Sequence, residues 1–105
     1  VTYTWYYTNV YVTGADGNSY NKAAESDVYF SANKAWRIAT RERSATNSKF
    51  DVRTIATHEV GHSLGLADLY GSTDSDKIMY GYNNGQVKWY LRSGDKLGLW
   101  ALYGN

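Results

Sequence analysis

Two histidines and a glutamate form the pattern in this chain with the clearest chemical meaning. His58 and His62 are the only histidines among the 105 residues, and their spacing of four places both imidazoles on one face of a helix. Two imidazole nitrogens can then bind one metal ion. Glu59 lies roughly 100° round the helix from His58, so its carboxylate can reach a water on the metal without replacing a ligand. The pattern predicts a zinc site with Glu59 as general base.

A catalytic zinc needs a third protein ligand and one open position. The chain has no other histidine and no cysteine, and the acidic residues that follow the motif are all aspartates. Asp68 comes three residues after Gly65, and a chain reversal at that glycine would return it to the face with the histidines. Asp68 is therefore the preferred third ligand, and Asp74 or Asp76 is the next choice.

These residues predict hydrolysis of an amide by a single addition of water, with no covalent intermediate. The carboxylate of Glu59 would accept the proton of the attacking water and pass it to the leaving amine. A binding module that holds a polypeptide or polysaccharide without cutting it is the alternative, and a hydrolase of non-peptide amides is a further one. The module would require loss of the metal ligands or of the base, and the sequence retains both histidines and Glu59.

Two helices are expected around this chemistry. Asp51 is a good N-cap and Gly65 a good left-handed stop, which together delimit a helix of about 13 residues. A last helix is expected from Ser93 to Tyr103. Its two glycines weaken it, so tertiary packing must stabilise it.

The remainder of the chain predicts a small sheet and loops. Residues 1–13 are rich in β-branched and aromatic side chains and predict one or two strands, and 27–30 a further short strand. Residues 31–43 fit either a helix capped by Ser31 or a loop. Turns or irregular chain are expected at 14–18, 44–49 and 66–85.

Length and composition exclude several other classes of protein. A chain of 105 residues predicts a single domain, residues 1–105. With 11 basic and 10 acidic residues and no basic block, the chain gives no reason to expect a nucleic-acid or membrane partner. No apolar run approaches the length of about 18 residues that would span a bilayer. The first residues are not a signal peptide, so an exported protein would be present here as a processed form.

Four separate segments resemble the metzincin zinc metallopeptidases. The segment HEVGHSLGLAD is similar to the long signature HExxHxxGxxH, with Asp68 in the last position. The segment Ile78-Met79-Tyr80 resembles the Met-turn, and LRSGDKLGLWALYG resembles the C-terminal helix of matrixin-type domains. DVYFSANKAW and FDVRTIATHE are similar to bacterial matrixin-like peptidases. The likeness covers residues 27–104 in unbroken order, and its HExxHxxGxxD signature is snapalysin-like on a matrixin-like frame.

The resemblance implies an α+β fold with a small twisted N-terminal sheet, an active-site helix, a Met-turn and a C-terminal helix. Met79 would lie beneath the metal, and Asp95 would support the Met-turn. Tyr80, Gly81 and Tyr82 would contact the substrate. Gly81 stands where matrixins usually have a proline, and this residue belongs to the wall of the primed-side specificity pocket. The glycine leaves the stiffness of that wall in question.

The same likeness implies a secreted, monomeric endopeptidase that acts on polypeptides. Its substrate would lie antiparallel to an edge strand, whose counterpart here is expected at about residues 17–24. It also implies that residues 31–43 are mostly loop. A structural Ca²⁺ site near Asp16, Asn18 and Asp27 is a further possibility, although turn chemistry explains these residues equally well.

Overall fold

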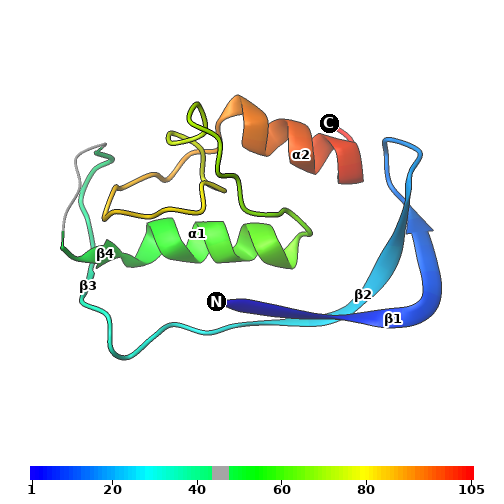
Figure 1. Cartoon of the computed structure of the whole chain (residues 1–105), viewed down its shortest axis with the longest axis horizontal. Coiled ribbons are helices and arrows are strands. Elements are labelled where there is room, and N and C mark those ends of the chain that lie inside the picture. Colours follow the sequence, from blue (N-terminus) through cyan, green and yellow to red (C-terminus); the bar gives the residue numbers. More distant parts are fainter. Residues whose placement is uncertain (44–47) are drawn as a thin grey trace.

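The structure, a computed structural model, describes residues 1–43 and 48–105. In chain order the elements are β1 (Thr2–Thr13), β2 (Ser19–Val28), β3 (Trp36–Arg37), β4 (Phe50–Asp51), α1 (Val52–Ser63) and α2 (Ser93–Tyr103). Figure 1 shows α1 as a central layer, with the β1–β2 hairpin along one side and α2 and the loops along the other. The predicted α+β fold is confirmed.

The N-terminal hairpin is a two-stranded antiparallel sheet. Its register runs from Thr2 opposite Val28 to Thr13 opposite Ser19. The pairing shifts between Trp5 and Tyr6 and again between Tyr6 and Tyr11. Asn9, in the second interval, has a positive φ of 61°, and such irregularities bend a strand.

The strand expected at 27–30 is wrong in its bounds, because β2 runs from Ser19 to Val28. The sequence SYNKAAES is poor in β-forming residues. Its pairing with β1 outweighs that weak preference, since strand propensity depends on context.

The helical alternative for residues 31–43 is wrong, and the implied loop is confirmed. Backbone groups of this segment bond to distant parts of the chain. Trp36 and Arg37 pair in parallel with β4, and the Ala39 amide donates to Asp51 Oδ1 at 2.9 Å. Of the loop predicted at 44–49, residues 44–47 lie outside the described part of the chain.

Local signals delimit α1 as predicted. The Asp51 carboxylate accepts the Thr54 amide at 2.9 Å and so caps the first turn. At the other end Gly65 has φ +99°, and the Leu66 amide donates to the Gly61 carbonyl at 3.0 Å. This reversal turns the chain back along the helix.

The second helix, α2, has the predicted bounds and is stabilised by contacts outside itself. At its start, Asp95 accepts the Arg92 amide at 2.9 Å. At its end, the carbonyls of Leu102 and Ala101 accept the amides of Ala15 and Asp16 at 3.0 and 2.8 Å. The hairpin turn therefore caps α2, which supplies the packing that a helix with two glycines requires.

The most buried residues lie between α1, the segment 78–88 and the start of α2. Among the described residues, the buried apolar side chains are Ile78, Met79 and Val87. The buried polar ones are Asp51, Thr54, Lys88 and Asp95. Across the same part of the chain, neither helix has the length and apolar character needed to cross a membrane.

Candidate metal centre

The structure brings His58, His62 and Asp68 together. The two Nε2 atoms are 3.0 Å apart, and Asp68 Oδ1 lies 3.0 Å from His58 Nε2 and 3.3 Å from His62 Nε2. Within residues 1–43 and 48–105, this is the group of three that could hold a metal ion. The side chains are 16%, 23% and 33% exposed in that order, so the cluster is open to solvent.

Backbone carbonyls fix the orientation of both imidazoles. His58 Nδ1 lies 2.7 Å from the Ile78 carbonyl oxygen, and His62 Nδ1 lies 2.8 Å from that of Leu66. A carbonyl oxygen can only accept, so each Nδ1 carries the hydrogen and donates it. In a neutral imidazole this leaves the lone pair on Nε2. Two lone pairs and a carboxylate oxygen thus face one another, an arrangement that a cation stabilises.

The spacing of these three atoms fits zinc. Tetrahedral zinc with bonds of 2.0 to 2.1 Å separates its ligand atoms by roughly 3.3 Å, and the three distances here are 3.0, 3.0 and 3.3 Å. Two imidazoles and a carboxylate are a donor set that zinc accepts, and such histidines usually donate Nδ1–H to a carbonyl or carboxylate.

The other aspartates considered as ligands lie elsewhere. Asp74 accepts the Gly71 amide at 3.1 Å and pairs with Lys77 at 3.4 Å. Asp76 also lies 3.4 Å from Lys77 Nζ and is exposed. The reversal at Gly65 thus selects Asp68 among the downstream carboxylates.

Glu59 lies on the same helix, and its carboxylate faces the start of β1. Its side chain is only 12% exposed, and the amino group of Val1 lies 3.4 Å from Oε1. The Thr2 hydroxyl donates to Oε2. Glu59 is not one of the three grouped residues, and both of its carboxylate oxygens have partners at the start of β1.

Met79 packs against the histidine-bearing helix, and Asp95 binds the backbone of the segment that contains Met79. Met79 is 1% exposed, and a Cβ at Gly61 of α1 would lie 2.3 Å from its sulfur. Asp95 accepts the amides of Ile78 and Met79, both at 3.0 Å. Asp95 therefore holds the segment whose Ile78 carbonyl orients His58.

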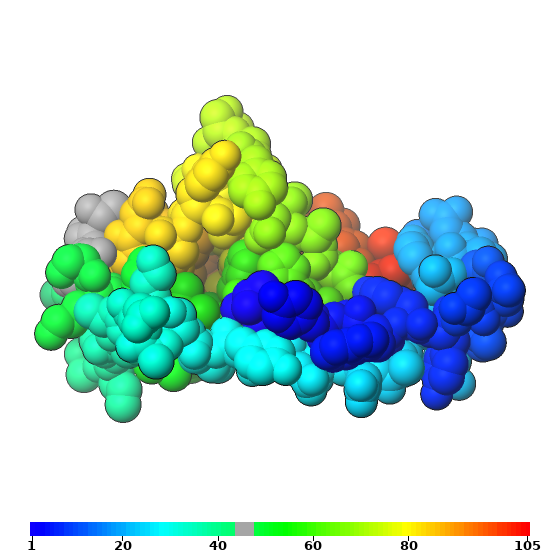
Figure 2. Space-filling view, turned by 60° about the horizontal axis from the view of Figure 1, so that its bottom comes forward, coloured from blue at the N-terminus to red at the C-terminus, as the bar shows by residue number. Residues whose placement is uncertain are grey.

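Tyr80, Gly81 and Tyr82 lie beside Leu69 and Tyr70, the residues that follow Asp68. The sequence analysis did not single out Tyr70. The Tyr70 hydroxyl donates to Asp68 Oδ2 at 3.2 Å, and its ring packs edge-on against Tyr82 with centroids 5.0 Å apart. Its position two residues after Asp68 is the only feature of the sequence that indicated this contact. Figure 2 shows this yellow-green and yellow part of the chain projecting from the surface.

Two buried charged side chains connect the loop 83–92 to its surroundings. Lys88 Nζ donates to the Lys77 carbonyl at 2.7 Å, and burial lowers its pKa. The Trp89 indole donates to Asp51 Oδ2 at 2.9 Å. Burial alone would raise the pKa of Asp51, but hydrogen bonds from Ala39, Trp89 and Thr54 outweigh it, and the pKa is lowered overall.

The residues considered for calcium are separated or already satisfied. Asp16 accepts bonds from the Asn18 amide and side chain and from the Tyr20 hydroxyl, at 3.0, 3.1 and 2.7 Å. These bonds lower the pKa of Asp16, and the hydrogen bond from the Tyr20 hydroxyl has the largest effect. Asp27 lies in β2 opposite Tyr3. Turn chemistry accounts for Asp16 and Asn18.

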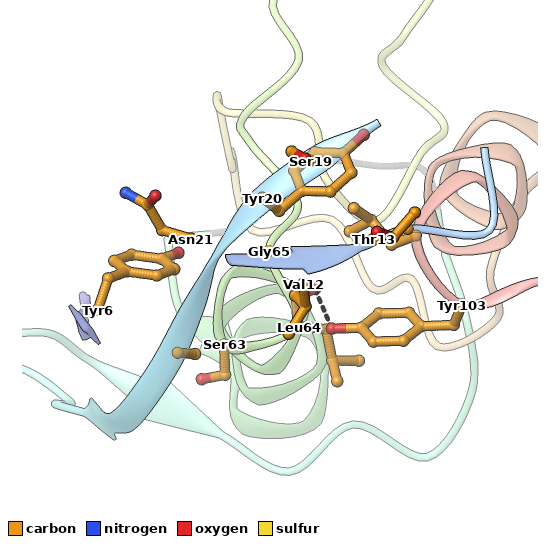
Figure 3. Close-up of a pocket in the computed structure, with 13 residues that line it drawn as sticks. Tyr6, Val12, Thr13, Ser19, Tyr20, Asn21, Ser63, Leu64, Gly65 and Tyr103 are labelled. Carbon is orange, nitrogen blue, oxygen red and sulfur yellow. Dashed lines mark hydrogen bonds between the residues drawn. The ribbon is translucent and has the colours of Figure 1, made fainter. Parts of the chain in front are cut away.

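A cavity of about 690 Å³ lies apart from the metal cluster. Figure 3 shows it between the hairpin and the C-terminal ends of α1 and α2, where the Tyr103 hydroxyl donates to the Leu64 carbonyl at 2.7 Å. Its lining includes Tyr6, Val12 and Tyr20 but none of the three grouped residues.

Comparisons with known proteins indicate the family of the chain. A sequence profile of the matrixin family matches residues 12–104. The chain is 34% identical over 79 residues to matrix metalloproteinase-2 of Drosophila melanogaster, 35% over 77 to karilysin of Tannerella forsythia, and 39% over 80 to hatching enzyme of Paracentrotus lividus. These alignments cover 74%, 73% and 75% of this chain, but only 10%, 14% and 12% of the relatives. No solved structure matches it significantly.

Proposed function

The chain belongs to the matrixin family, and on that premise we propose that it is a zinc-dependent endopeptidase. The observation that carries the proposal is the convergence of His58 Nε2, His62 Nε2 and Asp68 Oδ1 within 3.3 Å of one another. The chain spans only a small part of its relatives' length, so activity and substrate are argued from its own residues.

Each residue of the site has a separate role in this proposal. His58, His62 and Asp68 hold the ion, and the Asp68 carboxylate partly neutralises its charge. Zinc, when bound, acts as a Lewis acid on water and on the scissile carbonyl. Glu59 accepts the proton of the attacking water and returns it to the leaving nitrogen.

The proposed substrate is an extended polypeptide. Among residues 1–43 and 48–105, the strand β2 pairs on one side only, with β1, and an open strand edge can pair with an added peptide. Residues 17–24, which include the start of β2, are proposed to provide this edge. Tyr80, Gly81 and Tyr82 are proposed to contact side chains of the peptide.

Replacement of the general base tests the proposal. Glu59→Gln keeps the size of the side chain but removes its capacity to accept a proton, so cleavage of casein should fall 10²-fold or more. Zinc content should stay at the wild-type level, because Glu59 is not one of the grouped ligands. Glu25→Gln, the same change at an exposed position of β2, is the matched control. If Glu59→Gln cleaves casein as fast as the wild type does, Glu59 is not the general base.

A non-catalytic binding module is the second candidate, favoured by the exposed aromatic side chains of β1. Tyr3, Trp5, Tyr7 and Tyr11 are all exposed, and such rings can stack on sugars or peptides. A wild-type chain that is fully loaded with zinc, retains casein or a polysaccharide and cleaves neither would establish the module in place of the peptidase. Secretion, the monomeric state, a single domain over residues 1–105 and a calcium site stay predictions.

A further inference from the structure

We propose that Tyr70 is a positioning residue for the third metal ligand, and that position 81 is glycine because the Tyr70 ring occupies the space beside it. The inference rests on the proposed function, since it takes Asp68 as a zinc ligand. It adds Tyr70 to the metal site and explains why residue 81 is a glycine.

The two oxygens of Asp68 have different partners. Oδ1 faces His58 and His62 at 3.0 and 3.3 Å, whereas Oδ2 accepts the Tyr70 hydroxyl at 3.2 Å. A donor on Oδ2 directs the carboxylate to bind through Oδ1 alone. Partners of this kind fix the orientation of a ligand before the metal arrives.

The Tyr70 ring reaches Asp68 by lying directly against Gly81. A Cβ at Gly81 would be 2.2 Å from Tyr70 Cε1 and 2.7 Å from Cζ, so any other residue would displace the ring. Backbone bonds set this approach, because the Leu69 amide donates to Met79 and the Gly81 amide to Leu69, both at 2.8 Å. Tyr82 supports the ring from the side.

Packing alone does not account for Tyr70, because its side chain is 56% exposed. The contact that distinguishes it from its neighbour Tyr82, which is equally exposed, is the bond to Asp68. Asp68 and Gly81 thus both lie against the Tyr70 side chain, the first through a hydrogen bond and the second through the ring.

Zinc affinity, measured by competition with a chromogenic chelator on the whole chain, tests the inference. Tyr70→Phe should bind zinc about 10-fold more weakly, the lower end of the effect usual for such partners. Its metal-free unfolding midpoint in urea should match wild type, because the hydroxyl is at the surface. Tyr82→Phe is the matched control and should keep wild-type affinity.

A second pair of variants separates positioning from a general effect. In an Asp68→His background the imidazole replaces the carboxylate that accepts from Tyr70, so adding Tyr70→Phe should change zinc affinity by less than 2-fold. An equal loss in both backgrounds overturns the inference, and so does wild-type affinity in the single Tyr70→Phe variant. A wild-type chain that binds no zinc overturns the proposed function as well, which distinguishes the two failures.

Gly81 offers an independent measurement that does not require Asp68→His to fold. Gly81→Ala should displace the Tyr70 ring and weaken zinc binding about as much as Tyr70→Phe does. In a Tyr70→Ala background the same glycine change should have no further effect, because the ring is absent. Wild-type zinc affinity in Gly81→Ala alone contradicts the proposed role of Gly81.

Discussion

The N-terminal hairpin and the segment from Phe50 to Gly104 are stabilised in different ways. The hairpin has a long ladder of backbone pairs with two shifts of register, yet nearly all of its side chains are exposed. The later segment is mostly irregular between its two helices, yet it contains Met79, Val87, Asp51 and Asp95, the most deeply buried large side chains of the described chain. Long strand pairing and side-chain burial are therefore concentrated in different halves of the molecule.

The difference teaches how a small chain can fix a metal site without a large apolar core. Asp51 accepts bonds from Ala39, Thr54 and Trp89, and Asp95 accepts from Ile78, Met79 and Arg92. Each carboxylate joins distant segments of backbone, and Asp95 joins the one that orients His58. Buried polar groups that are fully satisfied specify one geometry.

Loss of the Asp95 carboxylate should have the largest effect. Asp95→Ala leaves the amides of Ile78, Met79 and Arg92 without acceptors in a buried region, so the free energy of unfolding should fall by about 4 kcal/mol. Urea unfolding measures the loss. Asp76→Ala, at an exposed position, should change it by about 0.5 kcal/mol or less. Equal midpoints for the two variants would contradict a difference between buried and exposed carboxylates.

Zinc should stabilise the two halves unequally. At a free zinc concentration of 100 Kd, binding to the folded state should add about 2.7 kcal/mol. Hydrogen exchange should slow chiefly in residues 52–69, which carry the three proposed ligands, and much less in the hairpin, residues 2–28. A chelator should reverse the change. Equal slowing in both regions would show that they are coupled more tightly than their contacts suggest.

Acid should lower the free energy of unfolding by protonating Asp51, which lies in the segment from Phe50 to Gly104. Its pKa is lowered in the folded state, so its contribution is present above the unfolded pKa of about 3.9 and is lost as pH falls through the folded value. Asp51→Asn should cost about 2 kcal/mol at pH 7, the value of hydrogen bonds to a charged group.

The asparagine variant should also lose less stability than wild type between pH 7 and pH 3. Asp27→Asn, an exposed position in β2, is the control and should leave the pH dependence unchanged. A wild-type pH profile for Asp51→Asn would assign the acid sensitivity to other groups, of which Glu42 is the first to test because its pKa is also lowered.

The sequence predicts the elements whose signals are local. Asp51 and Gly65 delimit α1 because a capping carboxylate and a left-handed glycine act within one turn of the helix. The approach of Asp68 to the histidines was also predictable, since it needs only the reversal at Gly65. Its role as a ligand stays a prediction.

Non-local partners explain what the sequence could not predict. Residues 19–26 form a strand only because β1 pairs with them, and residues 31–43 avoid a helix because Ala39 and Arg43 bond to Asp51 and Val87. The contact of Tyr70 with Asp68 requires the bridge between Leu69 and Tyr80. No local pattern encodes such contacts between segments.

Changes on the hairpin surface should have the smallest effect. Tyr11 is 60% exposed and lies opposite Asn21, so Tyr11→Thr keeps a residue that favours strands and removes little buried area. The free energy of unfolding should change by about 0.5 kcal/mol or less, measured in urea. The bonds Thr4–Ser26 and Ser26–Ser63, at 3.0 and 2.8 Å, tie the hairpin to α1 at its other end and remain intact in this variant. A loss comparable to that of Asp51→Asn would mean that the exposed aromatic face is covered in solution, and would remove the contrast between the two halves.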